Sequence, residues 1–88
     1  MTERPRRLPD MFSAEEWQEL SKQLGLSPRQ AQVARLICRG HMNRELATAL
    51  GIKPDTVRMH RRELFKKLKI TDRVGVPVRL ILAWRREK

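Results

Sequence analysis

Apolar residues recur along this chain every three or four positions, and short segments rich in polar residues and glycine separate the stretches that show this spacing. The spacing places the apolar side chains of each stretch on one face of an α-helix. No stretch alternates between apolar and polar residues, so nothing in the sequence favours a β-strand. We therefore predict an all-α fold, a single compact helical bundle over residues 13–88. Its helices are expected at 13–24, 27–39, 43–50, 54–68 and 72–86.

Start and stop signals support these boundaries. Ser13 and Ser27 each stand three residues before a Glu or Gln, which is the spacing of a capping box. Asn43 is expected to cap the short third helix, and Pro54 suits the first position of the fourth because the amide it lacks is not needed there. Gly51 supplies the left-handed conformation that ends a helix. The five helices are thus separated by short connections.

The two ends of the chain carry features that the helical pattern alone does not explain. Residues 1–12 contain two prolines and three arginines but few apolar residues, so we expect a flexible basic arm there. In the last helix Pro77 has no amide for the preceding turn and is expected to bend or restart the helix. This helix also carries two apolar stripes, which one small core cannot both bury. Leu80 and Trp84 are expected either to face another protomer or partner, or to fold back near Trp17.

Composition limits the function classes. Twenty basic against ten acidic side chains leave a net charge of +10 on 88 residues, which implies an anionic partner, with nucleic acid the first candidate. No run approaches the roughly 20 apolar residues that cross a bilayer, and no secretory signal is visible, so a cytoplasmic location is expected. The sequence contains no catalytic triad pattern, phosphate-binding glycine loop or metal-ligand cluster. We therefore expect neither an enzyme nor a cofactor.

The charge is concentrated in one segment. Residues 52–69 hold seven basic and two acidic side chains, so they carry +5, half of the total. Such a run of basic residues can also be a helix face that is exposed to solvent and has no binding role. Here, however, the helices at 43–50 and 54–68 are joined by a three-residue turn that begins with glycine, which is typical of a helix-turn-helix. The second helix of such a unit enters the major groove of DNA.

Helical counting identifies the outward face of the helix at 54–68. If its apolar residues point inward, then Arg58, Met59, Arg62 and Lys66 form one outward stripe that starts near the helix N-terminus. An Arg side chain reads guanine through O6 and N7, and an apolar side chain can touch a thymine methyl. We therefore predict base contacts from the first three residues of this stripe. For the phosphates we predict contacts from Thr56, Lys53, Lys66 and Lys67.

Residues 27–74 resemble the LuxR/FixJ/GerE-type helix-turn-helix domain. The most specific blocks are Asn-Arg-Glu-Leu-Ala at 43–47, Leu-Gly-Ile at 50–52 and Thr-Val-Arg-Met-His at 56–60. The resemblance implies a four-helix DNA-binding module of bacterial transcription regulators, which usually binds paired half-sites as a dimer. It implies that the helix after residue 71 forms the dimer surface. Residue by residue it implies base contacts from Arg58, Met59 and Arg62, and backbone contacts from Thr56, Lys66 or Lys67, Asn43 and Arg44.

The sequence thus predicts a sequence-specific regulator of transcription that binds double-stranded DNA. Its expected partners are DNA, a second copy bound through the C-terminal helix, and RNA polymerase. Only 26 residues precede the module, so we expect no sensor domain of the kind that many members carry. The alternative is a protein-interaction module or adaptor of the transcription machinery, in which the helix-turn-helix serves as a scaffold and the basic face binds an acidic protein.

Overall fold

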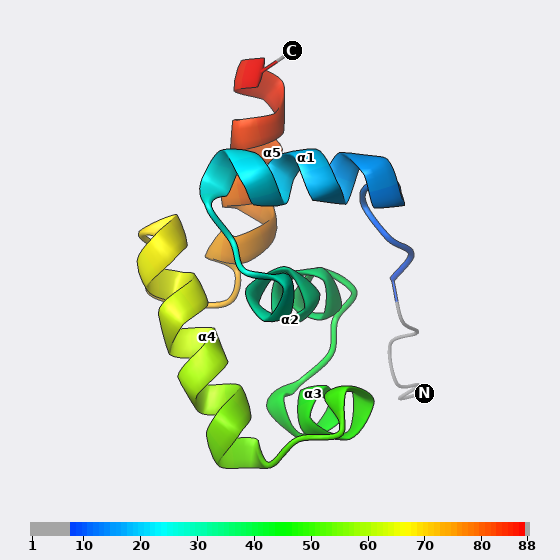
Figure 1. Ribbon diagram of the computed structural model, residues 1–88, viewed down its shortest axis with the longest axis vertical. Coiled ribbons are helices and arrows are strands. Elements are labelled where there is room, and N and C mark those ends of the chain that lie inside the picture. Colours follow the sequence, from blue (N-terminus) through cyan, green and yellow to red (C-terminus); the bar gives the residue numbers. More distant parts are fainter. Residues whose placement is uncertain (1–7, 88) are drawn as a thin grey trace, which may run out of the picture.

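The computed structural model describes residues 8–87, and the side chains of residues 8–86. Within these residues the chain forms helices only, which confirms the all-α prediction (Figure 1). The five helices are α1 (Ala14–Leu24), α2 (Pro28–Cys38), α3 (Asn43–Leu50), α4 (Pro54–Leu68) and α5 (Gly75–Glu87).

The first four helices begin and end within one residue of the predicted bounds, because the local signals work as expected. Ser13 caps α1: its hydroxyl accepts from the Glu16 amide at 3.2 Å, and the Glu16 carboxylate accepts from the Ser13 amide at 2.7 Å. The cap of α3 differs from the prediction. Asn43 is the first helical residue, and Met42 is the cap. The Met42 amide donates to the Glu45 carboxylate at 2.7 Å, so Glu45 satisfies a donor at this helix end without an Asn cap.

Helix α5 starts at Gly75, three residues later than predicted. The Gly75 amide donates to the Asp72 carboxylate at 3.2 Å, so Asp72 precedes the helix and does not belong to it. Pro77 is the third residue of α5 and lies in its first turn, where a missing amide breaks no hydrogen bond within the helix. A Cβ on Gly75 would stand 3.0 Å from side-chain atoms of Ile70, so this close approach favours glycine.

Helix α2 is at the centre of the molecule and contacts each of the other four helices. The core is built from the inward stripes that the periodicity predicted for α1 to α4, joined by residues of α5. Its largest fully buried side chains are Leu20, Val33, Leu46, Val57, Leu64, Leu68, Val76 and Leu80. Because α2 supports α3 and α4 together, the helix-turn-helix is part of this core rather than an appendage to it.

The segment before α1 is not the flexible arm that composition suggested, at least from Leu8 onward. The Leu8 amide donates to the Arg39 carbonyl at 3.1 Å, and the Arg39 side chain donates back to the Leu8 carbonyl at 3.0 Å. Asp10 accepts two hydrogen bonds from the Arg35 guanidinium, both at 2.9 Å. These contacts hold the segment along α2. The rest of the predicted arm, residues 1–7, lies outside the described residues.

The C-terminal helix packs back on this segment, which decides between the two alternatives for its apolar stripes. Phe12 is buried, with its ring centroid 5.4 Å from that of Trp17 and 5.7 Å from that of Trp84. Trp84 is half-buried and Leu80 is fully buried. The prediction of a partner surface at Leu80 is therefore wrong, because the packing of α5 on α1 and α2 turns that stripe into the core of its own chain.

Candidate nucleic-acid interface

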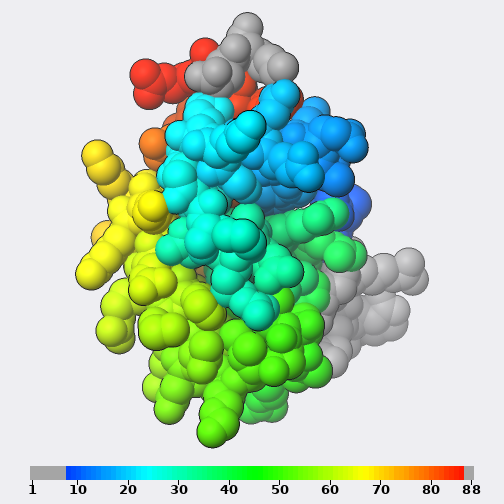
Figure 2. All heavy atoms as spheres, viewed as in Figure 1, coloured from blue at the N-terminus to red at the C-terminus, as the bar shows by residue number. Residues whose placement is uncertain are grey.

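Helices α3 and α4 form the predicted helix-turn-helix. Gly51 ends α3 in the left-handed conformation, with φ at 66°, and the chain needs only residues 51–53 before α4 begins at Pro54. Val57, Leu64 and Leu68 bury the inner face of α4 against its neighbours. The side chains at positions 58, 59, 62 and 66 of α4 are exposed and therefore available to a partner, and Figure 2 shows the yellow-green side chains of this helix at an open edge of the molecule.

This open face carries the residues predicted to contact bases. Arg58, Met59 and Arg62 are all exposed and lie on successive turns, as helical counting predicted. The Arg58 guanidinium is 3.7 Å from the Asp55 carboxylate, but these side chains are 72% and 93% exposed. An ion pair between groups this well solvated holds them weakly, so Arg58 is available to exchange Asp55 for another acceptor.

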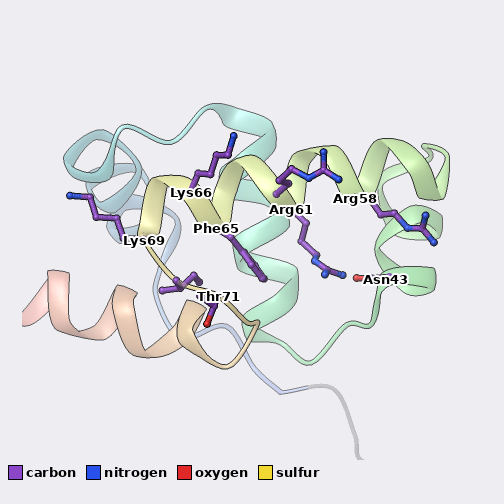
Figure 3. Close-up of a pocket in the computed structure, with 9 residues that line it drawn as sticks. Asn43, Arg58, Arg61, Phe65, Lys66, Lys69 and Thr71 are labelled. Carbon is purple, nitrogen blue, oxygen red and sulfur yellow. The ribbon is translucent and has the colours of Figure 1, made fainter.

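A groove follows the same face and collects cations from α4 and the loop after it. Figure 3 shows Arg58 and Lys66 projecting from different turns of α4 and Lys69 projecting from the residue after the helix, with Asn43 of α3 at the far end of the groove from Thr71. The residues that line the groove are Asn43, Arg58, Arg61, Arg62, Phe65, Lys66, Lys69, Ile70 and Thr71. Five of them are basic and none is acidic, so the groove favours an anion.

Sequence reasoning missed two of these cations. Arg61 is half-buried, and its guanidinium lies 5.4 Å from the centroid of the Phe65 ring. Arg61 lies at the edge of the outward stripe of α4, so helical counting assigned it no role. It does belong to the basic segment at residues 52–69 that the sequence identifies. Lys69 follows the last residue of α4, with φ at 57° and ψ at 49°. This left-handed turn at the end of the helix leaves Lys69 exposed on the groove.

The residues predicted to contact phosphate divide into two groups. Lys53 and Arg44 are exposed near the start of α4 and α3, and Thr56 is half-buried in the first turn of α4. Lys53 caps α4 without a side-chain hydrogen bond, so its ammonium is not engaged with the helix. Lys67 lies elsewhere, because its ammonium donates to the Gly25 carbonyl at the end of α1, at 2.6 Å. Its contact stabilises the bundle instead of facing the groove.

A side chain outside the helices fixes the α3 end of the groove. Arg73, in the loop before α5, donates to the His41 carbonyl and to the Met42 sulfur in the loop before α3. Burial lowers the pKa of Arg73, and the nearby positive charge of Arg61 lowers it further, while Glu45 opposes this shift. The two loops are thus held together beside Asn43, which keeps the start of α3 next to α4.

Residues 8–86 contain no group of three His, Cys, Asp or Glu side chains that could hold a metal ion. None of the helices among the described residues is long and apolar enough to span a membrane. Cys38 is buried, as its position on the inner stripe of α2 predicted, and burial raises the pKa of its thiol to about 12. A thiol with that pKa is unreactive at neutral pH.

The model of one protein family, "Bacterial regulatory proteins, luxR family", matches residues 24–79, which is more than half of the chain. The chain belongs to the luxR family. The match covers α2, α3, α4 and the first five residues of α5, and it leaves all of α1 but its last residue outside. This confirms the resemblance noted in the sequence. Helix-turn-helix domains of the luxR family bind DNA, and here the luxR helix-turn-helix is the unit that carries the basic groove.

Several luxR-family regulators are similar over this region. The transcriptional regulatory protein UhpA of Escherichia coli K12 is 36% identical over 59 residues, which are 67% of this chain and 30% of UhpA. The transcriptional regulatory protein MctR of Rhizobium johnstonii is 43% identical over 58% of this chain and 24% of its own length. The response regulator protein TodT of Pseudomonas putida is 38% identical over 62% and 26%. The matched region therefore spans less than a third of each relative. No solved structure matches the chain significantly.

Proposed function

We propose that this luxR-family chain binds double-stranded DNA in the bacterial cytoplasm, recognises a specific sequence, and thereby regulates transcription. The observation that carries the proposal is the open face of α4, where Arg58, Met59 and Arg62 are exposed over successive turns of a helix whose other face is buried in the core. A rigid helix of this kind, at the second position of a helix-turn-helix, is the element that enters the major groove.

Base recognition is assigned to the first three turns of α4. The Arg58 and Arg62 guanidinium groups can each donate two hydrogen bonds to guanine O6 and N7, a pairing that contributes about 1–3 kcal/mol of discrimination. The Met59 side chain, 48% exposed between them, is suited to contact a thymine methyl group. We therefore expect each half-site to contain guanine at two positions and thymine next to one of them.

Phosphate contacts are assigned to the residues around this stripe. Lys66 on α4 and Lys69 just after it line the groove, and Lys53 and Arg44 lie at the starts of the two helices of the unit. Asn43, Thr56 and the free amides in the first turn of α4 add uncharged donors. Each cation that neutralises a phosphate contributes about 0.9 to the salt slope of binding, so four cations predict a slope of about −3.6 per chain.

The C-terminal helix is assigned to dimerisation, through a stripe different from the predicted Leu80 and Trp84. Val78 is 52% exposed, Ile81 43% and Leu82 50%, and these positions fall on one side of α5. Large apolar side chains gathered on an open helix face favour association. A second copy of the chain fits this stripe best, because a dimer would place two α4 helices on paired half-sites.

The proposal is tested by equilibrium binding of single variants to a duplex selected by the parent chain. Arg58→Ala and Arg62→Ala are each expected to cost about 1–3 kcal/mol and to relax the preference at defined bases. Lys66→Ala should weaken binding to all sequences alike, and Lys22→Ala, on α1, is the control that should change little. If both Arg variants keep the affinity and the base preference of the parent, the assignment of α4 to the major groove is wrong.

The same titrations distinguish the alternative, in which the basic face binds an acidic protein. DNA recognition predicts a steep loss of affinity with salt together with a preferred site. A chain with no preferred site would support a protein-interaction module or a non-specific binder. The expected contact with RNA polymerase stays a prediction, since none of the described surfaces is specific to that partner.

A further inference from the structure

A cleft lies between α1 and α2, on surface that the residues assigned to DNA do not use. Its volume is about 710 Å³, and its apolar lining comes from Trp17, Leu26, Pro28 and Ala31. Trp17 and Leu26 are buried, so this α1–α2 cleft reaches the edge of the core. Figure 1 shows α1 at the end of the molecule opposite α3, so a partner in the cleft leaves the start of α4 free for DNA.

The charge of the α1–α2 cleft is opposite to that of the chain. Glu15 and Glu19 line the cleft, are exposed, and make no ion pair with any described residue. They are four residues apart, so both carboxylates project from the same side of α1. Two basic residues also line the cleft, but Arg35 is already bonded to Asp10, which leaves Lys22 as one charge against two. The cleft therefore favours a cation, although the chain as a whole carries +10.

The C-terminal helix carries a surface that is complementary to this cleft. Val78, Ile81 and Leu82 are exposed on one side of α5. Arg85, which is also exposed, continues the same stripe, because it follows Ile81 by four residues and Leu82 by three. At a rise of about 1.5 Å per residue, this α5 stripe is about 10 Å long and the α1 wall of the cleft, residues 14–22, is about 12 Å long. The cleft is therefore long enough to receive the exposed side of one α5 helix.

A second α5 stripe would complement the first less well than the cleft does. Residues 75–86 contain Arg79, Arg85 and Arg86 but no acidic side chain, so two stripes that face each other offer Arg85 no counter-charge. The cleft offers apolar contact together with the carboxylates of Glu15 and Glu19. Complementary charge of this kind favours one partner surface over another.

We propose that two copies of the chain associate by placing the α5 stripe of one copy in the α1–α2 cleft of the other. Ile81 and Leu82 cover the apolar lining of the cleft, and Arg85 meets the carboxylates of Glu15 and Glu19. This inference rests on the proposed function, which assigns α5 to dimerisation, and it adds the surface that receives α5. That surface is built mainly from α1, which lies almost entirely outside the residues that the family model matches.

The proposed contact joins two different surfaces, so it is heterologous. Within one chain these surfaces face different ways. The α5 stripe lies on the side of its helix away from the buried residues Val76, Leu80 and Ala83. Helix α1 contacts α5 through Gln23, which donates to the Ala83 carbonyl at 3.1 Å and does not line the cleft. Two copies joined in this way are not related by a two-fold axis, so we expect half-sites in direct and not inverted orientation.

Sedimentation of charge-reversal variants without DNA tests the contact. Glu19→Arg alters the cleft and Arg85→Glu alters the stripe, and each alone should weaken self-association at least about tenfold, because repulsion replaces attraction. An equimolar mixture of these two variants should form a 1:1 dimer, since the intact cleft of one receives the intact stripe of the other. Glu63→Arg is the matched control and should associate as the parent does, because Glu63 is exposed on α4 outside both surfaces. Recovery of association in the mixture also shows that both variants are folded.

The outcomes separate this inference from the proposal of DNA recognition. A Glu19→Arg variant that associates as strongly as the parent would show that the stripe binds elsewhere, and a mixture that stays monomeric would overturn the contact as well. It is also overturned by an equal loss of association in the Glu63→Arg control, by a parent that stays monomeric, or by selected DNA with inverted half-sites. A parent that associates as expected but prefers no duplex site would overturn the proposed DNA recognition and leave the contact standing.

Discussion

Replacing Lys69 by glycine is expected to make the protein more stable while weakening its binding to DNA. Lys69 ends α4 with φ at 57°, and it is the one non-glycine residue with positive φ in the described part of the chain. In this conformation the Cβ of an L-residue lies too close to a carbonyl oxygen, which costs free energy. Glycine has no Cβ and avoids this cost. Lys69 also lines the basic groove, so one residue combines backbone strain with a proposed phosphate contact.

The size of the effect follows from the surroundings of Lys69. The left-handed conformation costs an L-residue about 1–2 kcal/mol, and the greater freedom of glycine in the unfolded chain offsets about 0.4–1 kcal/mol of the gain. The capping hydrogen bonds, from the Lys69 amide to Lys66 and from the Ile70 amide to Phe65, use backbone atoms and persist in the variant. The exposed side chain contributes little packing. A net gain of about 0.5–1 kcal/mol remains, which raises Tm by about 2–8 °C.

Urea unfolding and DNA titration across a salt series measure the two effects separately. Lys69→Ala is the matched control, because alanine removes the charge but keeps the Cβ. Both variants should reduce the magnitude of the salt slope by about 0.9. Only the glycine variant should gain stability. The strain argument is refuted if the glycine variant is no more stable than the alanine variant.

Three further predictions follow from contacts outside the groove. Lys67→Ala should lower the free energy of unfolding by about 1 kcal/mol, because it loses the hydrogen bond to the end of α1, yet the salt slope of DNA binding should not change. Leu80→Ala should cost about 2–5 kcal/mol in denaturant unfolding. Leu82→Ala should cost much less there and should mainly weaken the proposed dimer, as measured by sedimentation. The Arg35 hydrogen bond lowers the pKa of Asp10, so this pair stabilises the fold fully above about pH 4 and the effect is lost as pH falls through the lowered pKa. Asp10→Asn should therefore cost about 0.2–1 kcal/mol at neutral pH and progressively less as pH falls below about 4, as measured by unfolding across that pH range.

The helices that the sequence predicted well are those whose signals are local. The capping box at Ser13, the proline at 54 and the glycine at 51 act within a few residues, so helix bounds could be read without knowledge of the fold. The outward stripe of α4 could also be counted from residue 54, since its inner face is strongly apolar. Arg58 and Arg62 are exposed for that reason.

The contacts that sequence reasoning missed or misplaced depend on distant parts of the chain. Composition alone suggested that the segment around Asp10 is mobile, because its partner Arg35 is 25 residues away. Leu80 was ambiguous because two apolar stripes share α5, and only the packing against α1 and α2 selects one of them. Lys67 lies in a basic run, but a long side chain can reach either way around a helix, and the carbonyl that binds it belongs to Gly25.

Selection of binding sites from random double-stranded DNA, performed in parallel with the parent chain and with Arg62→Ala, tests the central claim most directly. The parent should enrich one motif with paired half-sites. The variant should enrich the same motif without its preference at one guanine position in each half-site, since Arg62 is assigned to a single base. An identical motif from both proteins would contradict the assignment of α4 as the reading helix, and no enriched motif from the parent would contradict specific DNA recognition itself.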